Sequence, residues 1–143
     1  MAHSQLDNLV RINQLRAEEA TEEEIQGMLR SGQRSLEDAR RKELSLVSRF
    51  ILGYSAAHSF ALAALRMHGY RSDSRYLVFQ CLQHTVDLPA EQWRILDTAH
   101  RKRNLAEYAG MTDVDESFFR ELIEVTQEVA ARVDNLISKR WGT

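Results

Sequence analysis

The chain has 143 residues, of which 43% are hydrophobic and 28% are charged, and this size and balance are typical of one globular domain. Its net charge of −2 excludes a general electrostatic attraction to nucleic acid or to an anionic membrane, so binding of that kind needs a local patch of positive charge. One proline, six glycines and few β-branched residues beside Leu, Ala, Arg and Glu favour an all-α fold.

The first half of the chain predicts three helices. Apolar residues spaced through 6–15 indicate a short leading helix. Thr21 and Glu24 have the spacing of a capping box, which opens a second helix that ends near the charged run R-R-K-E. A third helix, rich in alanine along one side, is expected from about 44 to 68, with Gly69 as a left-handed terminator.

The second half predicts three more helices. One is expected over about 74–86, and Pro89 suits the first turn of the next, which continues to 109–110. Asp113 and Glu116 have the spacing of a second capping box, which opens the last helix. Short loops between successive helices imply an antiparallel, up-and-down bundle.

These elements organise the whole chain, residues 1–143, as a single helical-bundle domain. The bundle of four to five helices is expected over residues 21–138, with residues 1–20 as a leading helix or extension. The N-terminal sequence lacks the basic start and apolar run of a signal peptide, and the longest nearly uncharged stretch, 50–65, is too short to span a bilayer. Because Cys81 is the only cysteine, an intrachain disulfide is excluded and a reducing compartment is favoured. We therefore expect a cytoplasmic protein without membrane contact.

The most informative stretch is 100–110, H-R-K-R-N-L-A-E-Y-A-G, because it gathers ionisable and polar groups on one predicted helix. Four of them lie at i, i+3, i+4 and i+7 and share one helix face: His100, Arg103, Asn104 and Glu107. Arg101 and Lys102 are expected to point away from that face into solvent. The stripe is either an exposed helix end, stabilised by the helix dipole and an Arg103–Glu107 pair, or a polar pocket that binds phosphate through the arginine fork.

Two segments carry a resemblance to a known family. One is the pair of helices that runs from L-E-D-A-R-R-K into S-R-F-I-L-G-Y-S-A-A-H-S-F-A-L-A-A-L-R-M-H-G-Y-R, and the other is R-N-L-A-E-Y. On these segments the chain resembles, over about residues 21–138, the HEPN superfamily of small helical bundles from prokaryotic toxin–antitoxin and nucleotidyltransferase-linked systems. The superfamily motif is an arginine, usually followed by a polar residue, and a histidine four to six residues later. Arg103 and Asn104 match its opening, and Tyr108 stands where the shortest form has histidine.

The resemblance implies a homodimer in which two motif copies face each other across one groove. It also implies metal-independent RNA cleavage, in which a histidine takes the ribose 2′-hydroxyl proton and an arginine stabilises the charge on phosphorus. A tyrosine, with an ordinary pKa near 10, is a poor base at neutral pH but can orient a phosphate or a nucleobase. His100, one turn before Arg103, could supply the imidazole instead. Arg103 and Tyr108 lie about 140° apart around a straight helix, so they can share a site only near a helix end or across a two-fold axis.

The candidate site therefore has two groups of residues. The catalytic candidates are Arg103, Tyr108 and His100. The substrate-binding candidates are Asn104, Glu107, Arg71 and Arg75. With Arg66, the last two cluster around Gly69 and are either solvated loop charges or part of a surface that follows phosphates. Three further histidines are expected to be structural or surface residues and not ligands or catalytic groups: His58, His68 and His84. We expect no cofactor and no metal site, since no histidine pair has ligand spacing with a carboxylate.

Three functions remain open from the sequence. The first is a HEPN-like dimer that binds RNA or a nucleotide, either as a weak metal-independent endoribonuclease of a toxin–antitoxin system or as a degenerate binding form. The second is a non-catalytic interaction module whose groove binds a protein partner, such as a nucleotidyltransferase-type antitoxin. The third is a structural bundle whose polar stripe only stabilises a dimer.

Overall fold

Helices dominate the computed structural model, which describes residues 2–110 and 113–142. In chain order the elements are α1 (Ala2–Arg11), β1 (Arg16–Ala17), α2 (Glu22–Ala39), α3 (Leu46–Met67), β2 (Tyr70–Arg71), α4 (Arg75–Gln80), α5 (Leu82–Thr85), α6 (Ala90–Ala109) and α7 (Glu116–Trp141). The all-α class is confirmed, with one addition that the sequence did not predict: β1 and β2 form a short antiparallel pair. The two ends of the domain predicted over 1–143, Met1 and Thr143, lie outside the described residues.

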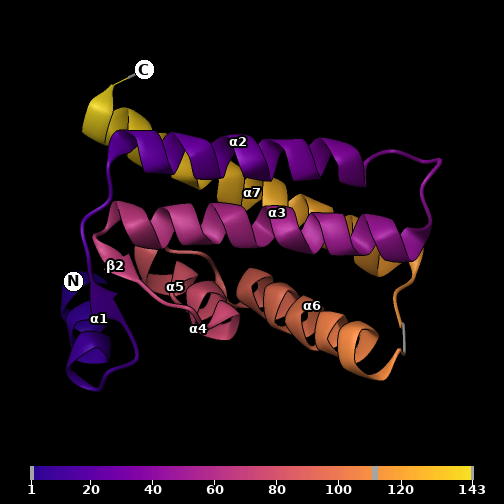
Figure 1. Cartoon of the computed structure of the whole chain (residues 1–143), viewed down its shortest axis with the longest axis horizontal. Helices are drawn as coiled ribbons and strands as arrows, with labels where there is room; N and C mark the ends of the chain where they lie inside the picture. Colours follow the sequence, from indigo (N-terminus) through magenta and orange to yellow (C-terminus); the bar gives the residue numbers. More distant parts are fainter. Residues whose placement is uncertain (1, 111–112, 143) are drawn as a thin grey trace.

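The long helices alternate in direction along the chain (Figure 1). Helices α2, α3, α6 and α7 run back and forth, and α4 and α5 connect α3 to α6. This arrangement confirms the antiparallel bundle. Helix α3 is the central element, because it packs against α2, α4, α6 and α7. No helix in 2–110 or 113–142 combines the length and the apolar character needed to cross a membrane.

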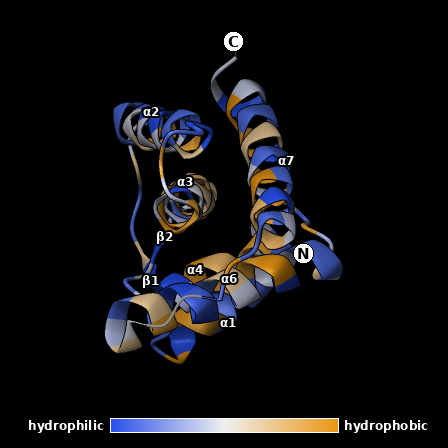
Figure 2. Cartoon of the chain, turned by 90° about the vertical axis from the view of Figure 1, so that its right-hand side faces the viewer, coloured by the Kyte–Doolittle hydropathy of each residue, from blue (hydrophilic) through white to orange (hydrophobic). Residues whose placement is uncertain are grey.

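The central place of α3 follows from its composition. Its buried positions are mostly alanine and aromatic residues, so neighbouring backbones can approach closely between the larger rings. Gly32 of α2 shows how close this approach is, since a Cβ atom built there would lie 2.8 Å from the ring of Phe60. Figure 2 looks along α2 and α3, with hydrophilic residues on the outer surface of α2.

Local signals in the sequence set most helix boundaries. The capping box is present, because Glu24 N donates to the Thr21 hydroxyl and Thr21 N donates to the Glu24 carboxylate. Gly69 follows the end of α3 with φ of 87°, and Gly110 ends α6 with φ of 64°, a region that glycine adopts without strain. Pro89 is the residue immediately before α6.

Three boundaries differ from the predictions. The leading helix ends at Arg11, before Leu15, which is nevertheless buried with 3% of its surface exposed. The predicted helix over 74–86 is divided at Cys81 into α4 and α5, and the turn allows both Phe79 and Leu82 to be buried.

The third difference is the start of α7, where the predicted cap at Asp113 is wrong. Asp115 is the N-cap residue, and its carboxylate accepts a hydrogen bond from Phe118 N at 2.8 Å. The Asp113 carboxylate is bound instead by Lys102 Nζ at 3.3 Å. Helix α7 therefore begins two residues later than predicted, and Asp113 contacts α6 instead of capping α7.

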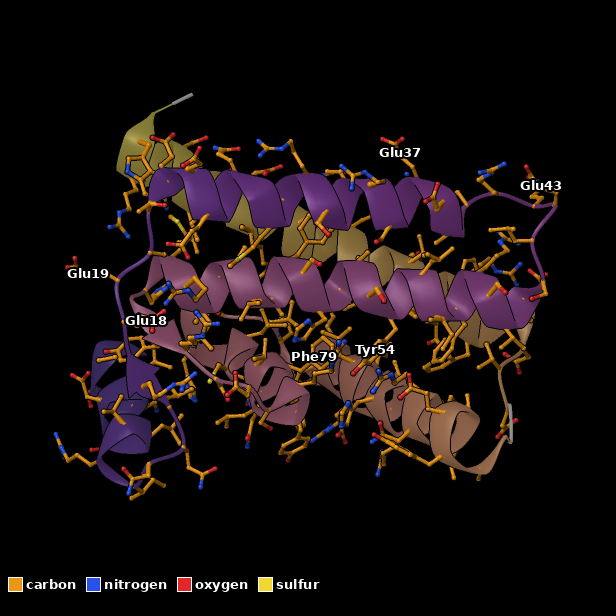
Figure 3. All side chains as sticks on the ribbon, in the orientation of Figure 1. Glu18, Glu19, Glu37, Glu43, Tyr54 and Phe79 are labelled. Carbon is orange, nitrogen blue, oxygen red and sulfur yellow. The ribbon has the colours of Figure 1, made fainter. Side chains whose placement is uncertain are left out.

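The leading segment is fixed to the bundle by polar contacts as well as by packing of α1 against α5. The Tyr70 hydroxyl donates to the Asp7 carboxylate, and the Arg66 guanidinium donates to the carbonyl oxygens of Glu18 and Glu19. Figure 3 shows Glu18 and Glu19 on the connection between α1 and α2. These contacts place the β1–β2 pair beside the C-terminal end of α3.

Candidate functional site

A chain of polar side chains links α3 to α6. Tyr54 Oη lies 2.9 Å from His100 Nδ1, and Asn104 Nδ2 lies 3.4 Å from His100 Nε2. When the imidazole hydrogen is on Nδ1, His100 donates to Tyr54 and accepts from Asn104. The other tautomer reverses both directions, with the Asn104 amide turned over. Tyr54 is almost fully buried, with 1% of its surface exposed, and its hydrogen bond fixes the orientation of the His100 ring.

Two arginines flank this chain. The guanidinium carbon of Arg103 lies 5.4 Å from the centre of the Tyr54 ring, and that of Arg75 lies 5.7 Å from it. Arg103 also forms an ion pair with Glu107 at 3.0 Å, and its side chain is only 18% exposed. Within 2–110 and 113–142, no carboxylate forms an ion pair with Arg75. We call this set the polar cluster: Tyr54, Arg75, His100, Arg103, Asn104 and Glu107.

Phe79 of α4 is the apolar residue that packs against the rings of the polar cluster. Its ring centre lies 5.5 Å from that of Tyr54 and 6.4 Å from that of His100. It also contacts the ring of His58 at 5.9 Å, so a second histidine lies beside the cluster. Figure 3 places Tyr54 and Phe79 between α3 and the layer of α4 and α6.

The positive charge of this region resides on the arginines. Burial lowers the pKa of His100 below its ordinary value, and the neighbouring Arg103 lowers it further. Burial lowers the pKa of His58 to about 4. Burial raises the pKa of Tyr54, against the opposite effect of the arginines. At pH 7 both imidazoles and the phenol are therefore neutral, and the imidazoles can accept a proton.

Most of the residues predicted for the site come together. Helix α6 supplies His100, Arg103, Asn104 and Glu107 on one face, and that face turns toward α3 and α4. Arg75 joins them from α4. The Arg103–Glu107 pair expected of an exposed helix end is also present, but the stacking of Arg103 over Tyr54 shows that the stripe faces the bundle.

Two predicted residues stand apart from the polar cluster. Tyr108 is 80% exposed and is not brought to the cluster within one chain. Arg71 lies on β2 and pairs with Glu18 at 3.0 Å. It lines a pocket of about 240 Å³ that His58 and Arg75 also line.

Arg101 and Lys102 were both predicted to be solvated, and the structure agrees for only one of them. Arg101 is 68% exposed, as expected of a solvated residue, and pairs with Asp97. Lys102 was expected to be solvated, but only 20% of its side chain is exposed. It donates to the Asp113 carbonyl oxygen at 2.6 Å and lies 5.2 Å from the centre of the Phe118 ring, because the segment before α7 passes over α6.

Tyr54 is a member of the polar cluster that was not predicted from the sequence. Tyr54 and His58 lie four residues apart on α3, a spacing that places both on one helix face. That spacing was the available signal. The partner on α6 is 46 residues away in sequence, so helical periodicity alone does not identify the pair.

No group of three or more His, Cys, Asp or Glu side chains within the described part of the chain is arranged to hold a metal ion. No protein-family model matches the chain, and no curated protein and no solved structure matches it either.

Proposed function

We propose that the chain binds RNA, or a nucleotide, through its phosphates at the polar cluster, in the manner of the HEPN superfamily that its motif resembles. The observation that supports this most is that the guanidinium groups of Arg75 and Arg103 both lie within 5.7 Å of the centre of the Tyr54 ring, whose hydroxyl bonds to His100. Two partly buried guanidinium groups offer bidentate donors to a phosphate, and the Arg75 guanidinium is not neutralised by an ion pair in 2–110 or 113–142.

The same arrangement suits metal-independent cleavage of RNA. His100 is neutral at pH 7, since its pKa lies below 6.5, and a substrate that displaces Asn104 from Nε2 would leave this nitrogen able to take a proton from a ribose 2′-hydroxyl. Arg103, on the same helix face, would stabilise the negative charge that develops on the phosphorus oxygens. Tyr54 would act as a positioning residue, since its hydrogen bond fixes the orientation of the His100 ring.

The test is binding and cleavage of RNA by variants of α6. We expect Arg103→Ala to weaken binding of a fluorescent single-stranded oligoribonucleotide by about tenfold, the equivalent of about 1.4 kcal/mol, and to abolish cleavage of tRNA in buffer containing a chelator. His100→Gln should retain binding and lose cleavage.

Arg101→Ala is the matched control, because it removes an equal charge from the solvated side of α6. A folded Arg103→Ala protein that binds as tightly as the wild type would contradict the proposal. Binding without cleavage in the wild type, lost in Arg103→Ala, would identify the degenerate binding form, and Tyr108→Phe then reports whether the phenol contributes.

A second function is supported by a different observation. Leu105 is 49% exposed and Tyr108 is 80% exposed, and both lie near the C-terminal end of α6, next to the motif. Single exposed apolar residues are common on protein surfaces, so the support for a protein–protein contact comes from position: the two lie three residues apart on α6, in the motif that the resemblance places at a dimer groove. The contact would be with a second copy of the chain, which would bring Tyr108 to the partner's groove, or with a nucleotidyltransferase-type antitoxin. Co-purification with the product of an adjacent gene, and no RNA binding, would favour the antitoxin.

A further inference from the structure

A small pocket lies next to the polar cluster, since Arg75 lines it together with His58. Its volume is about 240 Å³, and it lies where β2 and the start of α4 meet α2 and α3. Its polar lining is made by His58, Arg66, Arg71, Ser72, Asp73 and Arg75. The apolar part of the lining includes Met28 and Leu62.

The charged side chains that line this pocket are three arginines and one carboxylate, Asp73, which pairs with Arg16 at 3.5 Å. Arg66 and Arg71 share one carboxylate oxygen, Glu18 Oε2, at 3.2 and 3.0 Å. Arg66 has a second partner in Glu24 at 3.3 Å. Arg71 is 45% exposed and retains donors that Glu18 does not occupy. With Arg75, which pairs with no carboxylate in the described ranges, this group has four arginines, Arg16 included, against the three carboxylates of Glu18, Glu24 and Asp73, an excess of one positive charge.

His58 adds an uncharged hydrogen-bonding group to the same polar lining. Neither of its ring nitrogens has a hydrogen-bond partner in residues 2–110 and 113–142. Its depressed pKa keeps the imidazole neutral, with one N–H donor and one acceptor. An imidazole that is half-buried without a partner is suited to a ligand that enters the pocket.

The size of the pocket limits what that ligand is. Pockets that enclose a drug-sized molecule usually measure about 300–1,000 Å³, so this one is too small for a whole nucleotide. It has room for one phosphate group and part of the sugar that carries it. Met28 and Leu62 would then contact the sugar carbons, while the arginines and His58 bind the oxygens.

We propose that this pocket binds a terminal phosphate monoester, at the end of an RNA chain or on a mononucleotide. The inference rests on the proposed function, because Arg75 belongs both to the pocket and to the polar cluster. A monoester carries about −1.5 to −2 charge at pH 7, and a phosphodiester within a chain carries only one negative charge. Arg71 and Arg75 provide the two guanidinium forks that the more highly charged group requires.

The test compares matched oligoribonucleotides with a 5′-phosphate, a 3′-phosphate or hydroxyls at both ends. We expect one of the two phosphorylated forms to bind wild-type protein at least about tenfold more tightly than the hydroxyl form. Arg71→Ala and His58→Ala should lose this preference and keep the affinity for the hydroxyl form, since neither residue belongs to the polar cluster. Arg11→Ala is the matched control, because Arg11 is an exposed arginine that bonds to Asn8 and is not among the residues that line the pocket.

Equal affinity of wild-type protein for all three oligoribonucleotides would overturn the inference. If Arg103→Ala still abolished their binding, the proposed function would stand and only the pocket would fail. Binding of a nucleoside monophosphate and of inorganic phosphate, measured separately, distinguishes a mononucleotide from the end of an RNA chain as the source of the monoester. Binding of the mononucleotide that is lost in Arg71→Ala, in a protein that binds no oligoribonucleotide, would support the pocket and reject RNA as its source.

Discussion

Arg66 connects the end of α3 to the segment that precedes α2. Its side chain is 2% exposed, and it donates to the carbonyl oxygens of Glu18 and Glu19 and to the carboxylate of Glu24. The Nε atom of Arg66 is buried without a hydrogen-bond partner in residues 2–110 and 113–142. A buried guanidinium with this many structural acceptors stabilises the fold more than it serves a ligand.

We predict that Arg66→Ala lowers the free energy of unfolding by about 2–3 kcal/mol, because two backbone carbonyl groups and an ion pair lose their partner. Urea denaturation followed by circular dichroism measures this change. Arg71→Ala is the control: it removes the other arginine on Glu18, at an exposed position, and should cost less than about 1 kcal/mol. Equal losses in the two variants would show that Arg66 is not the structural member of the pair.

His58 predicts how stability depends on pH. Its folded-state pKa is about 4, below the ordinary value of 6.5, because it is buried and because Arg75, Arg103 and His100 lie near it. The unfolded chain therefore takes up a proton first as the pH falls. Stability contributed by neutral His58 is present above pH 6.5 and is lost between 6.5 and 4, by up to about 3 kcal/mol.

The measurement is urea denaturation at pH 7 and at pH 4.5 for the wild type and His58→Gln. We expect a smaller acid-induced loss in His58→Gln, since glutamine does not titrate. Other groups with lowered pKa values, such as His84, His100 and Glu24, are present in both proteins and cancel in the comparison. The same acid-induced loss in both proteins would refute the assignment to His58.

At the scale of elements, the close approach of α2 to α3 depends on a glycine. A Cβ atom at position 32 would lie 2.8 Å from the Phe60 ring, which is itself fully buried and has no space to move. We predict that Gly32→Ala lowers the free energy of unfolding by about 1–3 kcal/mol through overpacking.

Gly27 of the same helix provides the control. The nearest atom to a Cβ at that position is the end of the flexible Arg30 side chain, at 3.8 Å. Gly27→Ala should therefore stabilise the protein by about 0.5–1 kcal/mol, because alanine is the better helix former. Thermal melting of the two variants measures opposite shifts, and a stabilised Gly32→Ala protein would disprove the tight contact.

Local signals account for the elements that the sequence predicts well. Thr21 with Glu24, and Pro89 with Gly110, mark their boundaries through neighbouring residues alone. The predicted start of α7 is wrong because it involves a residue distant in sequence: Lys102 of α6 binds the carboxylate of Asp113, the predicted cap. The candidate site likewise has one part that local sequence spacing predicts and one part that it does not. The face of α6 follows from helical spacing, whereas the approach of Tyr54 requires the packed bundle.

The two ends of the whole molecule carry different exposed apolar residues. Leu105 and Tyr108 lie at the C-terminal end of α6, and Ile12, which is 63% exposed, follows α1 at the opposite end in Figure 1. If the proposed homodimer forms at the end of α6, only the first pair is buried by it.

We predict that wild-type protein elutes as a dimer in size-exclusion chromatography with light scattering, and that Leu105→Ser combined with Tyr108→Ser elutes as a folded monomer. Both side chains are exposed in one chain, so their replacement should leave its fold intact. Ile12→Ser should remain dimeric. A wild-type monomer at high concentration, or a double variant that is still dimeric, would exclude this interface.

The packing of α2 against α3 also bears on the order in which the chain acquires structure. These helices are neighbours in sequence, so they can pair while the C-terminal half is still being synthesised. The polar cluster cannot form at that stage, because His100 and Arg103 lie on α6, 46 residues after Tyr54 in the case of His100. A nascent chain that ends before α6 would therefore be unable to bind through this cluster, and ligand binding would begin only after α6 has been synthesised.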